Sequence, residues 1–250
     1  AQALKNPDTK RAQAAFALPG DFKIAATGTP IENRLTELWS LFQFINPGLL
    51  GSRKRFEERY ANPIEQQRDS QVRKRLKQLL HPFILRRRKS EVLSELPART
   101  ETTIHVEPSD EEAALYEALR RQAVTRVAEE EGSLGQQRLR VLAEITRLRL
   151  ACCNPSLVVP ATGVTSSKLQ AFAELVEELL ENRHKALVFS QFVDHLAILR
   201  QHLDEQAIHY QYLDGGTPAS KRKAAVDAFQ RGEGDLFLIS LKAGGTGLNL

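Results

Sequence analysis

Methionine is absent from all 250 residues, and the chain has only two cysteines and one tryptophan. Cys152 and Cys153 are adjacent, so they cannot form an ordinary structural disulfide, and no His or Cys partner stands at zinc-ligand spacing. We therefore expect a reducing, intracellular setting in which both thiols pack in or beside a helix. The lack of methionine even at position 1, and an end directly after a glycine-rich run, indicate a segment of a longer protein.

Long apolar runs are missing too, which argues against a membrane-spanning helix, and no secretory signal pattern opens the chain. The sequence contains neither the phosphate-binding pattern Gly-x-x-x-x-Gly-Lys-Ser/Thr nor the dinucleotide pattern Gly-x-Gly-x-x-Gly. The second absence argues against a dinucleotide or nucleotide-sugar enzyme built from two α/β lobes. An apolar content of 42% can bury the core of one large or two modest domains, and a net charge of +4 suits a polyanionic partner without proving one.

Short apolar segments alternate with amphipathic helical patterns near both ends of the chain. Strands are predicted at residues 22–26, 185–190, 210–213 and 235–241, and this alternation is typical of parallel α/β sheets. The helix after residues 185–190 is expected to turn Val193, Leu196, Leu199 and Leu203 inward. Two such lobes are predicted.

The middle of the chain is predicted to be helical, at residues 53–80, 110–126, 138–152 and 168–181. Ser109 and Glu112 have the spacing of a capping box, and residues 132–135 are expected to turn one helix into the next. The predicted apolar stripes of the last three helices are Leu115, Leu119 and Val127; then Leu139, Leu142, Ile145 and Leu148; then Leu169, Phe172, Leu175, Val176 and Leu179.

The most informative run is Thr-Gly-Thr-Pro-Ile-Glu-Asn at residues 27–33, followed by a helical pattern with Trp39 and by Asn-Pro-Gly at residues 46–48. It places small hydroxylated residues and a glycine where a predicted strand meets a helix, which is where α/β sheets bind ligands. From these residues alone, a tight turn before an apolar helix is an equally good interpretation.

Three further segments carry possible phosphate contacts, and a fourth is a run of basic residues. Residues 185–192 end a buried strand in Ser-Gln-Phe, and helix N-termini bind phosphate. Residues 213–218 contain a predicted Gly-Gly turn before a helix whose first turn carries Lys-Arg-Lys. Positive charge at a helix N-terminus is mildly unfavourable, and a bound phosphate would relieve it. Residues 240–250 place glycines after a buried strand, where a backbone can approach a phosphate closely. The Arg-Arg-Arg-Lys run at residues 86–89 is, by itself, typical of a solvated surface.

In this order, the segments resemble the motifs of the Swi/Snf-type ATPases, the DNA-translocating branch of helicase superfamily two. The run at residues 27–33 resembles the third motif, and residues 185–192 and 240–250 resemble the fourth and fifth. Ala26, Arg88, Asn154 and Gly216 depart from the usual residues. The resemblance implies an α/β fold of two RecA-like lobes with helical insertions. Residues 1–97 would be part of lobe 1, with a helical protrusion at about 47–83. Residues 98–250 would be lobe 2, with a helical insertion at about 109–160, and the linker between the lobes would lie near residues 96–99.

The family also implies residue roles. Gln2 would lie beside the acidic pair of the second motif, which is expected just before Ala1. Coupling between nucleotide and DNA would rest on Thr27, Gly28, Thr29, Pro30, Asn33, Arg86 and Arg87. DNA contacts would come from Ser190, Gln191, Arg222, Lys242 and Thr246, and the nucleotide cleft would include Gly244, Gly245 and Gly247.

The implied function is that of an ATP-dependent translocase on double-stranded DNA, which uses ATP and Mg²⁺ and contacts the DNA through its backbone. Nucleoprotein or RNA polymerase complexes are implied as further partners, and no membrane is implied. Its location would be the bacterial nucleoid or the eukaryotic nucleus. The segment lacks the phosphate-binding loop, the acidic pair and the sixth motif, so we expect it to be inactive alone. The alternative is a non-enzymatic module that binds nucleic acid or protein with the same fold.

Overall fold

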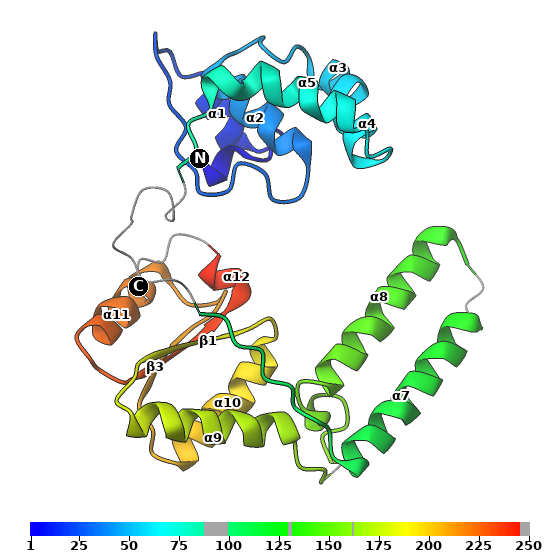
Figure 1. Ribbon diagram of the computed structural model, residues 1–250, viewed down its shortest axis with the longest axis vertical. Helices are drawn as coiled ribbons and strands as arrows, with labels where there is room; N and C mark the ends of the chain where they lie inside the picture. The colour runs from blue at the N-terminus through cyan, green and yellow to red at the C-terminus, as the bar shows by residue number, and fades with distance from the viewer. Residues whose placement is uncertain (88–99, 130–131, 162, 246–250) are drawn as a thin grey trace. The chain divides into compact units, whose positions relative to one another are not determined.

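The chain divides into two units, Ala1–Thr100 and Glu101–Leu250, each with its own buried residues. The computed structural model describes residues 1–87, 100–129, 132–161 and 163–245. The predicted linker at residues 96–99, and Arg88, Thr246 and Gly247, lie outside the described residues. Figure 1 shows the helices and strands of both units.

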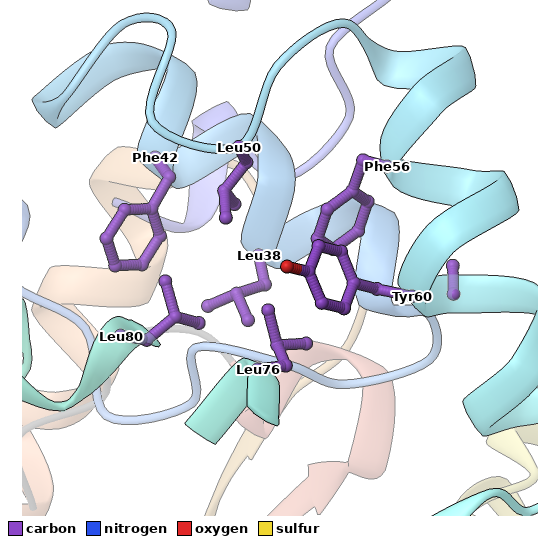
Figure 2. Close-up of a cluster of buried hydrophobic side chains, with 8 residues drawn as sticks. Leu38, Phe42, Leu50, Phe56, Tyr60, Leu76 and Leu80 are labelled. Atoms are coloured by element: carbon purple, nitrogen blue, oxygen red, sulfur yellow. The ribbon is translucent and has the colours of Figure 1, made fainter. Parts of the chain in front are cut away.

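Unit 1 contains helices but no strand in its described residues. In chain order these are η1 (Gln2–Leu4), α1 (Lys10–Phe16), α2 (Leu35–Ile45), α3 (Arg53–Phe56), η2 (Glu57–Ala61), α4 (Asn62–Glu65), α5 (Ser70–Leu80) and η3 (His81–Phe83). Their shared core contains Leu38, Phe42, Leu50, Phe56, Tyr60, Ala61, Leu76 and Leu80 (Figure 2). The core thus joins α2 to the predicted helical region at residues 53–80.

The strand predicted at residues 22–26 is absent, and this prediction was wrong. The segment has no regular structure, and Phe22 and Ile24 are 83% and 75% exposed. A strand exists through hydrogen bonds to a neighbouring strand, and unit 1 offers none among its described residues. The apolar pattern was therefore present without the pairing that would make it a strand.

Helix α2 is held at its N-terminus and again at its middle. The Glu37 carboxylate accepts hydrogen bonds from the backbone N–H groups of Glu32 (2.8 Å) and Asn33 (3.0 Å), and Glu65 accepts one from that of Leu35 (2.6 Å). These bonds satisfy backbone donors that a helix N-terminus and the turn before it would otherwise leave free. From the middle of the helix, the Trp39 indole N–H donates to the Gly51 carbonyl (3.0 Å). The run from the Thr-Gly-Thr-Pro segment to Gly51 is thus a single connected structure.

Unit 2 contains a three-stranded parallel sheet with helices on both faces. Its elements are α7 (Asp110–Ala128), α8 (Leu134–Ala151), η4 (Pro155–Leu157), α9 (Ser167–Glu181), β1 (Ala186–Ser190), α10 (Val193–Glu205), β2 (Tyr210–Leu213), α11 (Ala219–Gln230), β3 (Leu236–Ser240) and α12 (Leu241–Gly244). The strand order is β1-β3-β2. Three predicted strands are therefore confirmed, and the fold class is α/β.

The central strand β3 is buried on both faces, and its side chains alternate between two cores. Leu236 and Leu238 pack with residues of α9 and α10, whereas Phe237 and Ile239 pack with Phe229 of α11 and with α12. A continuous apolar run is what a parallel strand with two covered faces requires. On α10, Leu196, Leu199 and Leu203 point inward as predicted, but Val193 is 43% exposed.

Helices α7 and α8 form an antiparallel pair that projects from the sheet (Figure 1). Both begin with a capping box; the predicted Ser109–Glu112 box is confirmed, and Ser133 forms a second one with Gln136. The helix predicted at residues 138–152 is present in α8, but Leu139, Leu142 and Ile145 of its apolar stripe are exposed. None of the helices in the described part of the chain is long and apolar enough to cross a membrane.

Candidate functional site

A buried lysine ties the start of unit 1 to the Thr-Gly-Thr-Pro segment. The Lys5 side chain is almost fully buried, and its ammonium lies 2.7 Å from the Glu32 carboxylate and 3.8 Å from that of Glu37. It also donates a hydrogen bond to the Thr29 hydroxyl (3.3 Å). A buried ammonium is tolerated only with partners of this kind, so the position of Lys5 and the shape of the 27–33 loop are linked.

Glu32 collects the other polar groups of this cluster. Its Oε1 accepts hydrogen bonds from the Thr29 hydroxyl (2.9 Å) and from the Gln2 amide (2.5 Å). The hydrogen bond from Lys5, followed by those from Gln2 and Thr29, lowers the pKa of the Glu32 carboxyl to about 2. The carboxylate therefore stays ionised at any physiological pH. We call Gln2, Lys5, Thr29, Glu32 and Glu37 the Lys5 cluster.

A pocket of about 700 Å³ lies beside the same loop within unit 1. Its lining includes Thr27, Gly28 and Pro30 from the loop and Arg86 and Arg87 from the segment after η3. Both arginines are exposed. The structure thus brings Thr27, Gly28 and Pro30 near Arg86 and Arg87, and the coupling role that the family resemblance implies for them stays a prediction. Asn33 lies outside this lining and is held through its backbone N–H by Glu37.

In unit 2, the predicted DNA contacts Ser190, Gln191 and Lys242 lie at the carboxyl edge of the sheet. Ser190, the last residue of β1, pairs in register with Ser240, the last residue of β3, while β2 ends at Leu213 beside them. Gln191 directly follows β1. Lys242, the second residue of α12, comes two residues after the end of β3 and is exposed. Parallel α/β sheets bind ligands outside this edge.

The Gly-Gly turn at residues 214–217 is organised by Asp214. Its carboxylate accepts hydrogen bonds from the hydroxyls of Tyr212 and Thr217, each 2.9 Å. Burial by itself would raise the pKa of the Asp214 carboxyl. The hydrogen bonds from these two hydroxyls and from backbone N–H groups outweigh burial and lower the pKa. Arg222 donates to the carbonyls of Asp214 (2.9 Å) and Thr217 (3.1 Å). Arg222 therefore builds this turn, and a DNA contact by it stays a prediction.

The glycines after β3 have different surroundings. A Cβ on Gly244 would come within 2.9 Å of the Phe189 ring and 3.2 Å of Ile239, whereas one on Gly245 would meet nothing closer than 3.5 Å. Gly244 therefore allows α12 to pack closely on the sheet. The nucleotide-cleft roles of both residues stay predictions, and Thr246 and Gly247 lie outside the described residues.

A second pocket, of about 600 Å³, opens between the end of α8 and the end of β1. Arg149 donates a hydrogen bond to Gln191 and lies over the Phe192 ring, 5.6 Å from its centre. Ser190 contacts His195, whose pKa is lowered by burial and by the nearby Lys168 charge. Both predicted contacts at the end of β1 therefore face a pocket that also holds cationic and aromatic side chains.

Sequence reasoning missed the members of the Lys5 cluster other than Gln2 and Thr29, and it missed Arg149. The spacing of Glu37 from the helix start was an available signal, because a glutamate at the third position of a helix commonly accepts backbone hydrogen bonds. Lys5 offered no such signal, since nothing local shows that a lysine will be buried. No group of three or more histidine, cysteine or carboxylate side chains gathers to hold a metal in the described part of the chain.

Comparison with known proteins adds independent findings. The sequence model described as the SNF2-related domain matches residues 1–157, and that of the helicase conserved C-terminal domain matches residues 167–250. YwqA of Bacillus subtilis, provisionally named as an ATP-dependent helicase/translocase, is 37% identical over 258 residues, covering all of this chain and 28% of YwqA. The Arabidopsis thaliana ISWI chromatin-remodeling complex ATPase CHR11 is 31% identical, covering all of this chain and 24% of CHR11.

The solved structures give the same result for the fold. The SWI2/SNF2 ATPase core domain of Sulfolobus solfataricus is similar at a TM-score of 0.55 with 33% identity, covering all of this chain and 52% of that one. The same ATPase core in complex with double-stranded DNA is similar at a TM-score of 0.51 with 31% identity, over 96% of this chain and 52% of that one. The chain thus spans about a quarter of its curated relatives and about half of these structures.

Proposed function

Because the chain belongs to the SNF2-related family of ATP-dependent helicases and chromatin remodellers, we propose that it is part of an ATP-driven translocase that moves on double-stranded DNA. The observation that carries the coupling part of this proposal is the Lys5 cluster. It fastens the 27–33 loop to the segment at residues 2–5, beside which the acidic pair of the second motif is expected.

Through this cluster, residues 2–5 and the loop move together. A displacement of Gln2 or Lys5 pulls on Glu32, and Glu37 carries it to the N-terminus of α2. The loop in turn lines the pocket with Arg86 and Arg87. We infer that a change at the nucleotide site reaches these arginines through the Lys5 cluster and the 27–33 loop. Coupling between distant sites is carried by contiguous networks of hydrogen bonds and ion pairs of this kind.

The DNA-facing part of the proposal rests on the carboxyl edge of the sheet in unit 2. Lys242 is exposed there, and so are Lys221 and Lys223 at the start of α11. Phosphate contacts by lysines position a protein on DNA without reading its sequence. We therefore propose that this edge grips the DNA backbone, with Ser190 and Gln191 contributing polar contacts.

ATP would bind the whole protein and supply the free energy for movement. The described residues do not gather a set of ligands for Mg²⁺, so we assign no chemical step to them. Their role in the proposal is to position and transmit. We further propose that the whole protein remodels nucleoprotein complexes, in keeping with the chromatin-remodelling names of several relatives. RNA polymerase complexes as partners rest on the family resemblance alone.

The test is ATP turnover by the whole protein with and without duplex DNA. We expect duplex DNA to stimulate turnover, and Lys5→Met to lower the stimulated rate about tenfold, within the range of mutations that change coupling. Lys5→Arg should restore much of the rate. Lys10→Met removes an exposed lysine of α1 and should leave it unchanged.

Turnover that is absent or independent of DNA would contradict the translocase. Absent turnover with retained binding to duplex DNA or protein would support the alternative, a non-enzymatic binding module on the same fold. A normal stimulated rate in Lys5→Met would leave the translocase in place but remove the Lys5 cluster from its coupling route. The fragment alone is expected to bind duplex DNA and to show no turnover.

A further inference from the structure

Helix α8 has its polarity reversed relative to an ordinary surface helix. The one buried residue in α8 is a charged one, Glu144, which pairs with Arg126 of α7 (3.4 Å) and Arg147 (4.0 Å). Its apolar residues lie in water instead: Leu139 is 68% exposed, Leu142 is 60% and Ile145 is 48%. Scattered apolar residues on a surface are normal, but a contiguous row on one face marks an interaction site.

The row has a charged residue at each end. Arg138, Leu142, Ile145 and Arg149 follow one another at intervals of four, three and four residues, which places them along one face of the helix. At a rise of about 1.5 Å per residue, the two arginines stand about 16 Å apart. Arg138 is exposed and has no ion-pair partner among the described residues, and Arg149 bonds only to the neutral Gln191 and lies over Phe192.

We propose that this face of α8 docks an amphipathic helix of a partner protein, with apolar residues at its centre and an acidic residue near each end. The apolar centre would cover Leu139, Leu142 and Ile145. The two carboxylates would neutralise Arg138 and Arg149, which have no carboxylate partner in the described structure. The charge pattern thereby sets the partner's chemistry as well as its position along α8.

The same pattern argues against two other occupants. A second copy of α8 would bring arginine against arginine in either orientation, which is unfavourable. DNA would lay its regularly spaced phosphates over the uncharged Leu142 and Ile145, where they would lose water without gaining a partner. The acidic helix is the occupant that satisfies both the apolar centre and the charged ends.

The row also continues into the pocket beside β1. Ile145 and Arg149 line that pocket together with Tyr116 and Phe192. A helix docked along α8 would therefore end next to Ser190 and Gln191, at the carboxyl edge of the sheet. The docking surface does not depend on the proposed translocase activity, since it rests on the exposed side chains of α8 alone.

The experiment uses fluorescently labelled synthetic helices and the whole chain. The probe carries leucines at its centre and a glutamate near each end at the spacing of Arg138 and Arg149. One control peptide has the same composition in scrambled order, and another has lysine in place of each glutamate. We expect anisotropy to show that the acidic helix binds at least about tenfold more tightly than either control.

Variants of α8 then locate the site. Leu142→Ser should weaken binding about tenfold, whereas the matched change Ala143→Ser, on an exposed position of another face, should not. Arg138→Glu should reverse the preference towards the lysine peptide, which a merely misfolded variant would not do. Circular dichroism checks that each variant keeps its helix content.

Three outcomes would overturn the proposal: equal binding of the acidic and scrambled peptides, equal binding by Leu142→Ser and the parent chain, or no change of preference in Arg138→Glu. Displacement of the probe by duplex DNA at equal concentration would assign the face to nucleic acid instead. Concentration-dependent dimerisation lost in Leu142→Ser would assign it to a second copy of the chain.

Discussion

Lys5 and Glu32 show how a single ion pair fixes a loop whose backbone has no regular structure. The loop at residues 27–33 contains neither helix nor strand, yet its shape is fixed by carboxylates that accept from side chains and from backbone N–H groups. Charged acceptors make stronger hydrogen bonds than neutral ones. At the residue scale, function is therefore expected to depend on the ionisation of Glu32.

The pH dependence of this link follows from the lowered pKa of Glu32. An ordinary value of 4.5 falls to about 2 in the folded chain. The contribution of the ion pair is therefore fully present above 4.5 and is lost as the pH falls through about 2. Carboxyl NMR should find Glu32 mostly ionised at about pH 3.5, where an ordinary glutamate is mostly protonated. In Lys5→Met the midpoint should rise, and in Lys10→Met it should not.

The two cysteines are expected to differ in reactivity. Cys152 is exposed, whereas Cys153 is partly covered and burial raises the pKa of its thiol. Because the thiolate is the reactive form, Cys153 should be alkylated more slowly at neutral pH. Mass spectrometry of Cys152→Ala and Cys153→Ala after iodoacetamide treatment measures each rate. Equal rates in the two variants would show that the burial of Cys153 does not persist in solution.

At the scale of secondary-structure elements, close packing of α12 on the sheet depends on the absence of one side chain. A Cβ on Gly244 would press against Ile239, which is fully buried, and against Phe189, whose ring is partly exposed and can move. Gly244→Ala should therefore lower the free energy of unfolding by about 1–3 kcal/mol, as overpacking typically does.

Gly245→Ala is the matched control for this change. It adds the same methyl group one residue later, where the nearest atom is at 3.5 Å. Denaturant unfolding followed by circular dichroism should find it close to the parent chain. Destabilisation of both variants to the same extent would point to the backbone of the loop rather than to contact with Ile239.

The elements also show what sequence patterns can and cannot predict. The strands at β1, β2 and β3 and the Ser109–Glu112 capping box follow from local spacing, and all are present. The apolar stripe of α8 was also predicted from the spacing of its residues. Spacing shows only which side chains share one face of the helix. Whether anything covers that face depends on the rest of the structure, and Leu139 and Leu142 remain in water.

The candidate site was predictable in part for the same reason. Motif resemblance singled out Thr29, Arg86 and Arg87, and the structure places Arg86 and Arg87 beside the loop that contains Thr29. It did not single out Lys5, because a contact between residues 5 and 32 joins segments that no local pattern relates. The DNA contact of Arg222 was predicted from the family resemblance and from the basic run at the helix start, neither of which could reveal that its guanidinium donates to two carbonyls.

At the scale of the whole molecule, a modest net charge of +4 leaves DNA binding to the local placement of lysines. If the carboxyl edge of the sheet contacts phosphates, binding of the chain to duplex DNA should be independent of sequence and should weaken steeply with salt. Each phosphate contact contributes about 0.9 to the slope of log affinity against log salt concentration. Lys242→Ala should therefore reduce the slope by about 1.

Lys10→Ala provides the matched control, because it removes the same charge from an exposed position on α1 in unit 1. A general effect of net charge would change the slope equally in both variants, whereas a direct contact changes it only in Lys242→Ala. Two duplexes of different sequence, titrated by anisotropy at several salt concentrations, separate these cases. Affinity that differed strongly between the duplexes would indicate readout of bases, which requires groups that reach into a groove. Lysines at the edge of a sheet would then be an insufficient explanation for how this chain holds DNA.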